Sequence, residues 1–138
     1  MQIEMTIKGL VVDPITNMPI IVLRDAEGQR VLPIWVGIFE ANAIALRIEN
    51  ISTPRPMTHD LLRNVIEDLN GVVRKIVVSD LKDNTFYALI YVEVGGQTLA
   101  IDSRPSDAIA LALRADAPIF VEETVLDNAK GIDFSTDK

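Results

Sequence analysis

Hydrophobic and polar residues in the first part of the chain follow the pattern of β-strands. Residues 3–12, 20–23 and 30–36 are rich in Ile, Val and Leu, and turn-forming Pro, Asn, Asp and Gly residues separate them. The pattern then changes, because residues 37–51 combine Ala and Leu with the charged Glu40 and so favour a helix. We therefore predict a β-hairpin or meander of three strands, followed by a helix.

A second helix is predicted over residues 58–70. Thr58 stands where an N-cap is expected, and Asn70-Gly71 ends the helix. The apolar residues between them recur at helical spacing and form one stripe. This stripe consists of Leu61, Leu62, Val65, Ile66 and Leu69.

The second half of the chain again predicts strands and then a helix. The strands cover residues 72–78, 85–94 and 97–101, the helix starts near Pro105, and a short strand follows at 119–121. Two strand–helix segments look alike, and their helices read Asn42-Ala43-Ile44-Ala45-Leu46 and Asp107-Ala108-Ile109-Ala110-Leu111. This likeness suggests an internally duplicated strand–helix unit. Because consecutive strands outnumber strand–helix alternations, we expect an α+β fold with a mainly antiparallel sheet and about three helices.

Length and composition indicate one domain. The chain has 138 residues, 49% of them hydrophobic, and we expect the domain to span residues 1–125 with a polar tail over 126–138. The absence of cysteine excludes disulfide scaffolds, iron–sulfur clusters and thiol nucleophiles, and a single histidine excludes multi-histidine zinc sites. The longest apolar run, residues 31–39, is too short to span a bilayer, and the start of the chain lacks the features of a signal peptide. We expect a cytoplasmic protein with no membrane partner.

The formal net charge of −7 does not favour a broad basic face for nucleic acid. A polyanionic substrate would require a local basic pocket, or divalent cations that carboxylates hold against the phosphates.

The densest polar segment lies where a predicted strand leads into a helix, at residues 102–107. Backbone amides at this junction, together with Arg104 and the hydroxyls of Ser103 and Ser106, could hold a phosphate. Asp102 or Asp107 could hold a divalent cation. The alternative is helix capping, since Ser and Asp are preferred at helix starts whatever the function.

A second polar segment leads into the helix at residue 58, and Glu40 stands in an otherwise apolar helix. His59 could act as a general acid or base, or as a single metal ligand. The polar residues of these segments also have structural interpretations. His59 could be a hydrogen-bonded structural residue, and Glu40 could lie on a solvated helix face. Asp60, in the first turn of the same helix as His59, could interact with the helix dipole.

Three segments, in their order and spacing, resemble the bifunctional nuclease family. They are Leu32-Pro33-Ile34-Trp35-Val36-Gly37 leading to Glu40-Ala41, then Arg55-Pro56-Met57-Thr58-His59-Asp60-Leu61, and Asp102-Ser103-Arg104-Pro105-Ser106-Asp107-Ala108-Ile109-Ala110-Leu111-Ala112. The resemblance covers about residues 3–125. It implies a compact α+β domain, often self-associated, to which DNase and RNase activity has been attributed.

We therefore expect a nuclease that acts on DNA and RNA with the help of Mg²⁺ or Mn²⁺. From their chemistry, Glu40, His59 and Asp102 are the candidate catalytic residues. Arg55, Arg104 and Ser106 are the candidates for phosphate binding, and Asp102 and Asp107 are the candidate metal ligands. The alternative is a non-catalytic homo-oligomeric module that binds a ligand or a partner protein, with its polar motifs serving as helix caps and subunit contacts.

Overall fold

Two meanders, each followed by a helix, form the framework of the protein in the computed structural model, which describes residues 1–129. The elements in chain order are β1 (Gln2–Val12), β2 (Pro19–Asp25), β3 (Val31–Trp35), α1 (Ile38–Ile48), α2 (Thr58–Asp68), β4 (Gly71–Lys82), β5 (Thr85–Val94), β6 (Gln97–Ser103), α3 (Pro105–Ala115), β7 (Ile119–Glu122) and α4 (Glu123–Ala129).

The described residues form a seven-stranded sheet in the order β3-β2-β1-β7-β4-β5-β6. Five of its six strand pairings are antiparallel, and only the pairing of β4 with β7 is parallel. The α+β class is therefore confirmed. The sheet is mixed but mainly antiparallel, as expected, and the four helices of the described residues are close to the expected number of about three.

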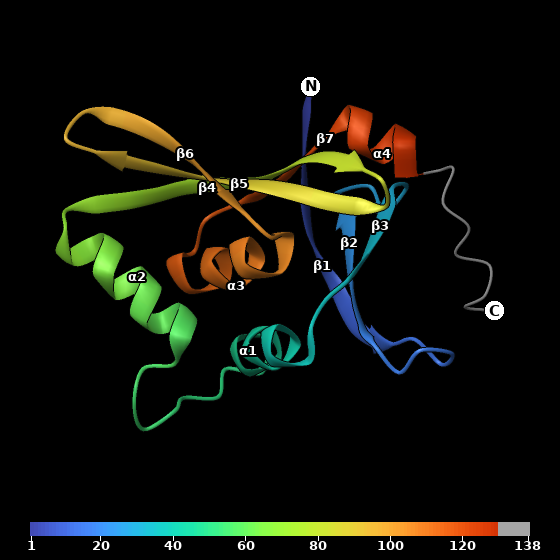
Figure 1. Ribbon diagram of the computed structural model, residues 1–138, viewed down its shortest axis with the longest axis horizontal. Helices are drawn as coiled ribbons and strands as arrows, with labels where there is room; N and C mark the ends of the chain where they lie inside the picture. Colours follow the sequence, from blue (N-terminus) through green and yellow to red (C-terminus); the bar gives the residue numbers. More distant parts are fainter. Residues whose placement is uncertain (130–138) are drawn as a thin grey trace.

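Both halves of the sheet have the same order of elements. A three-stranded meander leads into α1 in the first half and into α3 in the second, and β7 joins the halves at the centre of the sheet (Figure 1). The strands that precede these helices, β3 and β6, form the two outer edges. This arrangement matches the predicted repetition of a strand–helix unit. An ancestral duplication of that unit stays a prediction.

Helix α3 occupies the centre of the helical layer. It packs against β4 and β5, and both α1 and α2 pack against it (Figure 1). Its residues 108–112, Ala-Ile-Ala-Leu-Ala, are completely buried. Alanine lacks the bulk that would hold neighbouring helices apart, so the start of α3 lies close to the starts of α1 and α2.

The end of the described chain differs from the expected polar tail. Glu123–Ala129 forms helix α4, which packs against β4 and β7 and buries Val125, Leu126 and Ala129. The expected boundary at residue 125 falls within this helix, and the division into a domain and a tail stays a prediction. Residues 130–138 of the expected tail lie outside the described residues.

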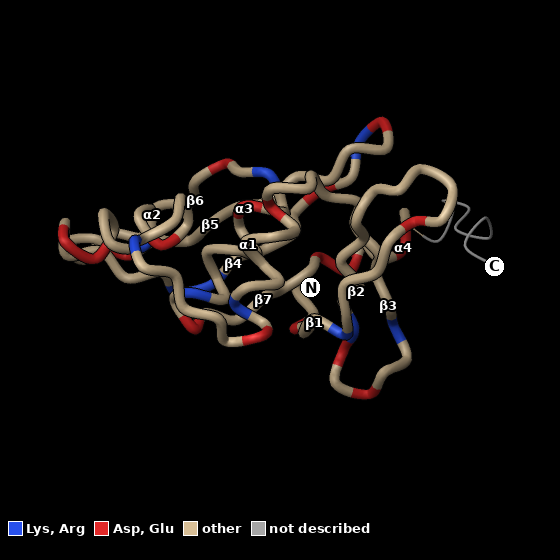
Figure 2. The backbone as a smooth tube through the Cα atoms, turned by 90° about the horizontal axis from the view of Figure 1, so that it is seen from below, with Lys and Arg blue, Asp and Glu red and all other residues tan. Residues whose placement is uncertain are grey.

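Charged residues of both signs are mixed along the described backbone. Figure 2 shows acidic and basic positions interspersed along the backbone as it is seen from below. Of the helices in residues 1–129, none is long and apolar enough to cross a membrane.

Candidate functional site

The first turns of three helices meet at one groove. Glu40 lies in the first turn of α1, His59 in that of α2 and Asp107 in that of α3. These side chains line a groove of about 940 Å³ together with Arg104, which precedes α3, and Asp102 of β6. Five of the predicted site residues therefore lie around one depression, although they come from three separate segments of the sequence.

Arg104 connects two acidic groups across this groove. Its Nε donates to Oδ2 of Asp107 at 2.9 Å, and its Nη2 donates to Oε2 of Glu40 at 3.1 Å. Both hydrogen bonds raise the pKa of the guanidinium above its ordinary value, and the bond to Asp107 has the larger effect. Since 64% of the Arg104 side chain is still exposed, the guanidinium can also meet a ligand from solvent.

The second oxygen of Asp107 contacts His59. Nε2 of His59 lies 2.9 Å from Oδ1 of Asp107, and the histidine is buried. An ionised carboxylate only accepts hydrogen bonds, so this contact favours the tautomer with the proton on Nε2. Nδ1 is then the ring nitrogen that can accept a proton, and Asp107 holds the ring in place.

Gly37 makes room for Glu40. A Cβ at position 37 would collide with Oε1 of Glu40, which folds back over the start of α1. This close approach leaves 18% of the Glu40 side chain exposed and directs its other oxygen to Arg104. Glu40 therefore does not lie on a solvated helix face, which was the structural alternative for this residue.

Arg114 connects the three helices by hydrogen bonds, and the sequence analysis did not single it out. This buried arginine of α3 donates from Nε to Oδ1 of Asp60 at 2.7 Å, and from Nη2 to the carbonyl of Ala43 in α1 at 3.0 Å. The signal that could have revealed it is a charged residue at the end of an alanine-rich, otherwise apolar helix.

Asp60 also caps α2. Burial by itself would raise the pKa of Asp60, but the amide of Met57 and the guanidinium of Arg114 outweigh burial and keep it below its ordinary value. The predicted N-cap, Thr58, is instead the first helical residue. Met57 occupies the cap position, and its amide donates to Oδ2 of Asp60.

Three predicted residues do not take part in the contacts among Glu40, Arg104, Asp107 and His59. Asp102 lines the groove at the exposed edge strand, and its carboxylate has no hydrogen bond or ion pair with any residue of 1–129. Arg55 lines a separate polar pocket between α1 and α2. Ser106 is buried and faces a different depression beside Trp35 and Phe86. The structure therefore does not bring Arg55 and Ser106 to the groove.

The donor groups in the groove do not form a complete metal site. No three His, Asp or Glu side chains of residues 1–129 are grouped so that they could hold an ion. Both oxygens of Asp107 already contact His59 and Arg104, which leaves Asp102 as the groove carboxylate without a partner in these residues. Mg²⁺ is often held by one or two carboxylates together with substrate phosphates, and Asp102 fits such a partial protein contribution.

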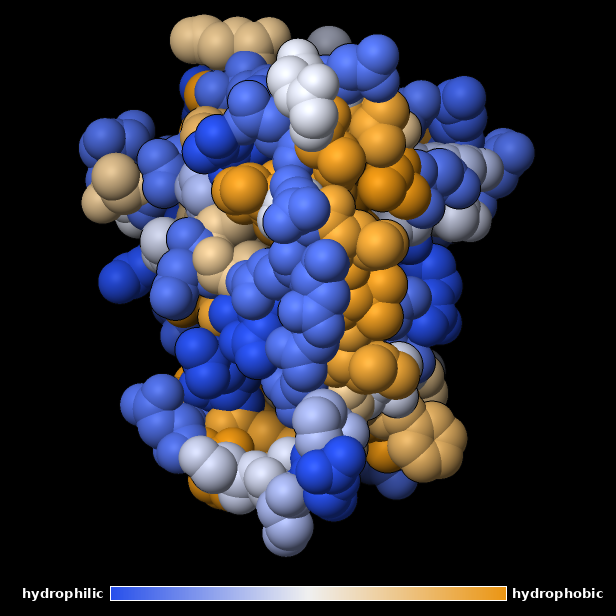
Figure 3. Space-filling model, turned by 90° about the vertical axis from the view of Figure 1, so that its left-hand side faces the viewer, coloured by the Kyte–Doolittle hydropathy of each residue, from blue (hydrophilic) through white to orange (hydrophobic). Residues whose placement is uncertain are grey.

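The rest of the groove is apolar. Leu61, Leu62 and Val65 of α2 and Ile101 of β6 form its walls, and all four are exposed. Figure 3 shows a column of hydrophobic side chains down the side of the molecule that carries α2. The groove therefore combines a charged end with an apolar wall.

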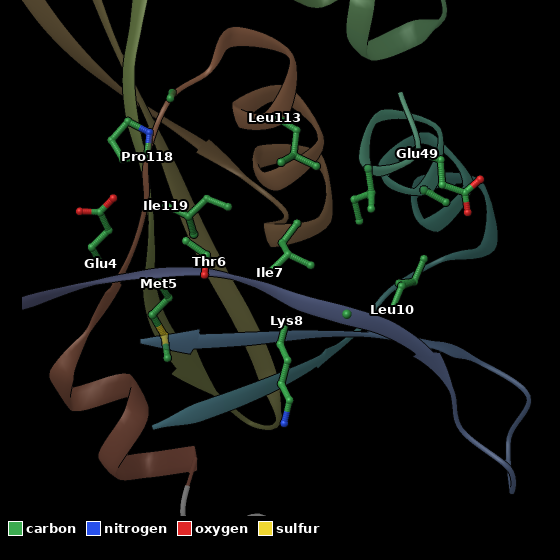
Figure 4. Close-up of a pocket in the computed structure, with 14 residues that line it drawn as sticks. Glu4, Met5, Thr6, Ile7, Lys8, Leu10, Glu49, Leu113, Pro118 and Ile119 are labelled. Atoms are coloured by element: carbon green, nitrogen blue, oxygen red, sulfur yellow. The ribbon is translucent and has the colours of Figure 1, made fainter. Parts of the chain in front are cut away.

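A second cavity, of about 570 Å³, lies between β1, α1 and α3. Ile7, Leu113 and Ile119 point toward one another there, whereas Lys8 points away from them (Figure 4). Since its centre is apolar, this cavity offers less acid–base chemistry than the groove.

Comparisons with known proteins agree with the resemblance noted in the sequence. The family model described as the bifunctional nuclease domain matches residues 21–133. An uncharacterized protein of Mycobacterium tuberculosis is 42% identical over 126 residues, which cover 91% of this chain and 75% of the mycobacterial one. Bifunctional nuclease 1 of Oryza sativa subsp. japonica is 29% identical over 78% of this chain, and bifunctional nuclease 1 of Arabidopsis thaliana is 27% identical over 76%. The matched part is 34% of each plant protein.

Proposed function

Because this chain belongs to the bifunctional nuclease domain family, we propose that it hydrolyses phosphodiester bonds in DNA and RNA at the groove where α1, α2 and α3 begin. The names of the plant relatives agree with this activity. The proposal includes the cytoplasmic location expected from the sequence.

The observation that carries the proposal is the continuous chain of contacts Glu40–Arg104–Asp107–His59. Glu40 and Asp107 hold the guanidinium of Arg104 at the groove, where it binds the phosphate and offsets the charge that develops during hydrolysis. Nδ1 of His59 accepts a proton from the attacking water, or returns one to the leaving oxygen, while Asp107 orients the ring.

Dependence on Mg²⁺ or Mn²⁺ is part of the proposal, with Asp102 as the protein ligand and the substrate phosphate as another. A bound divalent ion would supply additional neutralisation of phosphate charge. The proton transfer assigned to His59 does not depend on this ion.

The test is cleavage of single-stranded DNA, double-stranded DNA and RNA by the purified protein, with Mg²⁺, Mn²⁺ or EDTA. We expect metal-dependent cleavage that Arg104→Ala and Asp102→Asn each abolish while the circular dichroism spectrum stays unchanged. Arg74→Ala is the matched control and should cleave like wild type, because Arg74 is also exposed and ion-paired but lies on β4. Full activity in both groove variants would refute the assigned site.

The apolar wall of the groove favours a second candidate function, a non-catalytic module that binds an apolar ligand or a partner protein. Absence of cleavage under every condition, in a protein that is correctly folded, would favour this module over the nuclease.

We also propose that the protein forms a homo-oligomer through this apolar face. β6 is an edge strand exposed along most of its length, and it carries Leu99 and Ile101 next to the exposed leucines of α2. A second copy supplies the same apolar surface and the same open strand edge, so a two-fold contact is self-complementary.

A further inference from the structure

We propose that the polar pocket between α1 and α2 is a second phosphate-binding site, which holds the backbone of a single-stranded nucleic acid beyond the groove. This inference deepens the proposed function and rests on it. The pocket has a volume of about 480 Å³ and lies at the C-terminal half of α1, the loop after it, and the first turns of α2.

The pocket collects positive charge in an acidic protein. Four arginines and one aspartate line it, a net local charge of +3 in a chain of net charge −7. The aspartate is Asp60, whose two oxygens are already engaged by Arg114 and by the amide of Met57. Although Arg63 also interacts electrostatically with Asp60, this single carboxylate cannot balance four arginines, and a net charge of +3 stays in the pocket.

The ion-pair pattern singles out three of these arginines. Within residues 1–129, Arg30, Arg74, Arg104 and Arg114 form ion pairs. The arginines without one are Arg24, Arg47, Arg55 and Arg63. All of these except Arg24 line the pocket. Three unpaired cations in one depression repel one another, which an anionic ligand relieves.

Hydrogen bonds position two of these guanidiniums without neutralising them. Arg47 donates from Nε to the carbonyl of Leu113, and Arg63 donates from Nη1 to the carbonyl of Arg114. Both bonds lead to the end of α3, so the two cations stand on a rigid part of the fold. Arginine's planar fork matches the oxygens of phosphate, and Ser52, Thr53 and Asn50 add neutral donors to the wall.

The pocket adjoins the groove, since Met57 lines both. His59 faces the groove and Asp60 faces the pocket from the same turn of α2. A strand whose phosphate lies at Arg104 can therefore continue over Met57 and place a further phosphate among the three arginines. This geometry favours a flexible single strand over a stiff duplex.

The test measures binding of a labelled single-stranded DNA oligonucleotide by fluorescence anisotropy, in EDTA and over a range of salt concentrations. Compared with wild type, Arg47→Gln/Arg63→Gln should bind at least about tenfold more weakly. The slope of log affinity against log salt should become shallower by about 0.7 for each phosphate that the variant no longer neutralises. Arg24→Gln, which removes an exposed and unpaired arginine of β2 outside the pocket, should bind like wild type.

Equal affinities for the double variant and wild type would overturn the inference. It would also be overturned if Arg24→Gln weakened binding as much as the double variant does, or if wild type did not bind the oligonucleotide. If the double variant fails to fold, Arg55→Ala replaces it, because the Arg55 guanidinium makes no hydrogen bond or ion pair with residues 1–129. Cleavage distinguishes the two proposals. Binding that depends on the pocket in a protein that never cleaves refutes the nuclease alone, and normal cleavage with normal binding in the double variant refutes the second site alone.

Discussion

At the scale of single residues, the pairing of Asp60 with Arg114 makes stability depend on pH. The pKa of Asp60 lies below its ordinary value of 3.8, so its stabilising contribution is complete above about pH 5 and is lost as the pH falls below 3.8. We expect Asp60→Asn to lower the free energy of unfolding at pH 7 by about 2–3 kcal/mol, since it removes one partner of a largely buried ion pair.

Urea unfolding at pH 7 and pH 3 checks this expectation. The free energies of unfolding of wild type and Asp60→Asn should differ less at pH 3 than at pH 7. Asp80→Asn is the control, because Asp80 pairs with Lys82 at an exposed position and should contribute less than about 1 kcal/mol. A difference that is constant from pH 7 to pH 3 would contradict the assigned role of the Asp60 charge.

Sequence chemistry could predict the residues that line the groove better than those that hold it in place. Glu40, His59 and Asp107 stand out because each is polar at the start of an apolar helix. Ser106 has the same signature but faces another depression, because residue type and helix position do not say which way a side chain points. Arg114 could not be assigned because its partners, Asp60 and the carbonyl of Ala43, are distant in sequence.

At the scale of elements, hydrophobic periodicity predicted the strands and the first three helices well. The periodicity of α2 predicted a stripe but not its environment, and Leu61, Val65 and Leu69 face outward in this chain. The position of β7 between β1 and β4 could not be predicted, since strand order depends on pairings across the whole chain.

Helix α4 provides a test at the same scale, because its acidic sequence alone suggests a solvated tail. We expect Val125→Asp to lower the free energy of unfolding by at least about 3 kcal/mol, since it places a charge at a position that is 1% exposed. Thr124→Asp, at the neighbouring exposed position, should change stability by less than about 0.5 kcal/mol. Equal urea midpoints for the two variants would mean that α4 does not belong to the core.

At the scale of the whole molecule, the exposed apolar face determines whether the protein stays monomeric. We expect light scattering to show an oligomer, and Val65→Glu to dissociate it by placing a charge in the apolar contact. Ile15→Glu adds the same charge at an exposed isoleucine far from α2, in the turn between β1 and β2, and should leave the mass unchanged. A wild-type protein that is monomeric at every concentration would refute the proposed contact.

The central place of β7 in the sheet also affects how the chain can fold during its synthesis. β7 pairs with β1, where Met5 lies opposite Ile119, and with β4, where Ile76 lies opposite Ile119. A nascent chain can form each meander early, but it cannot join them until residues 119–122 have left the ribosome. Until then the inner edges of β1 and β4 are open to pairing with other chains, and contacts of such long sequence separation form slowly. The pairing of β7 therefore determines when these two edges close and can no longer pair with other chains.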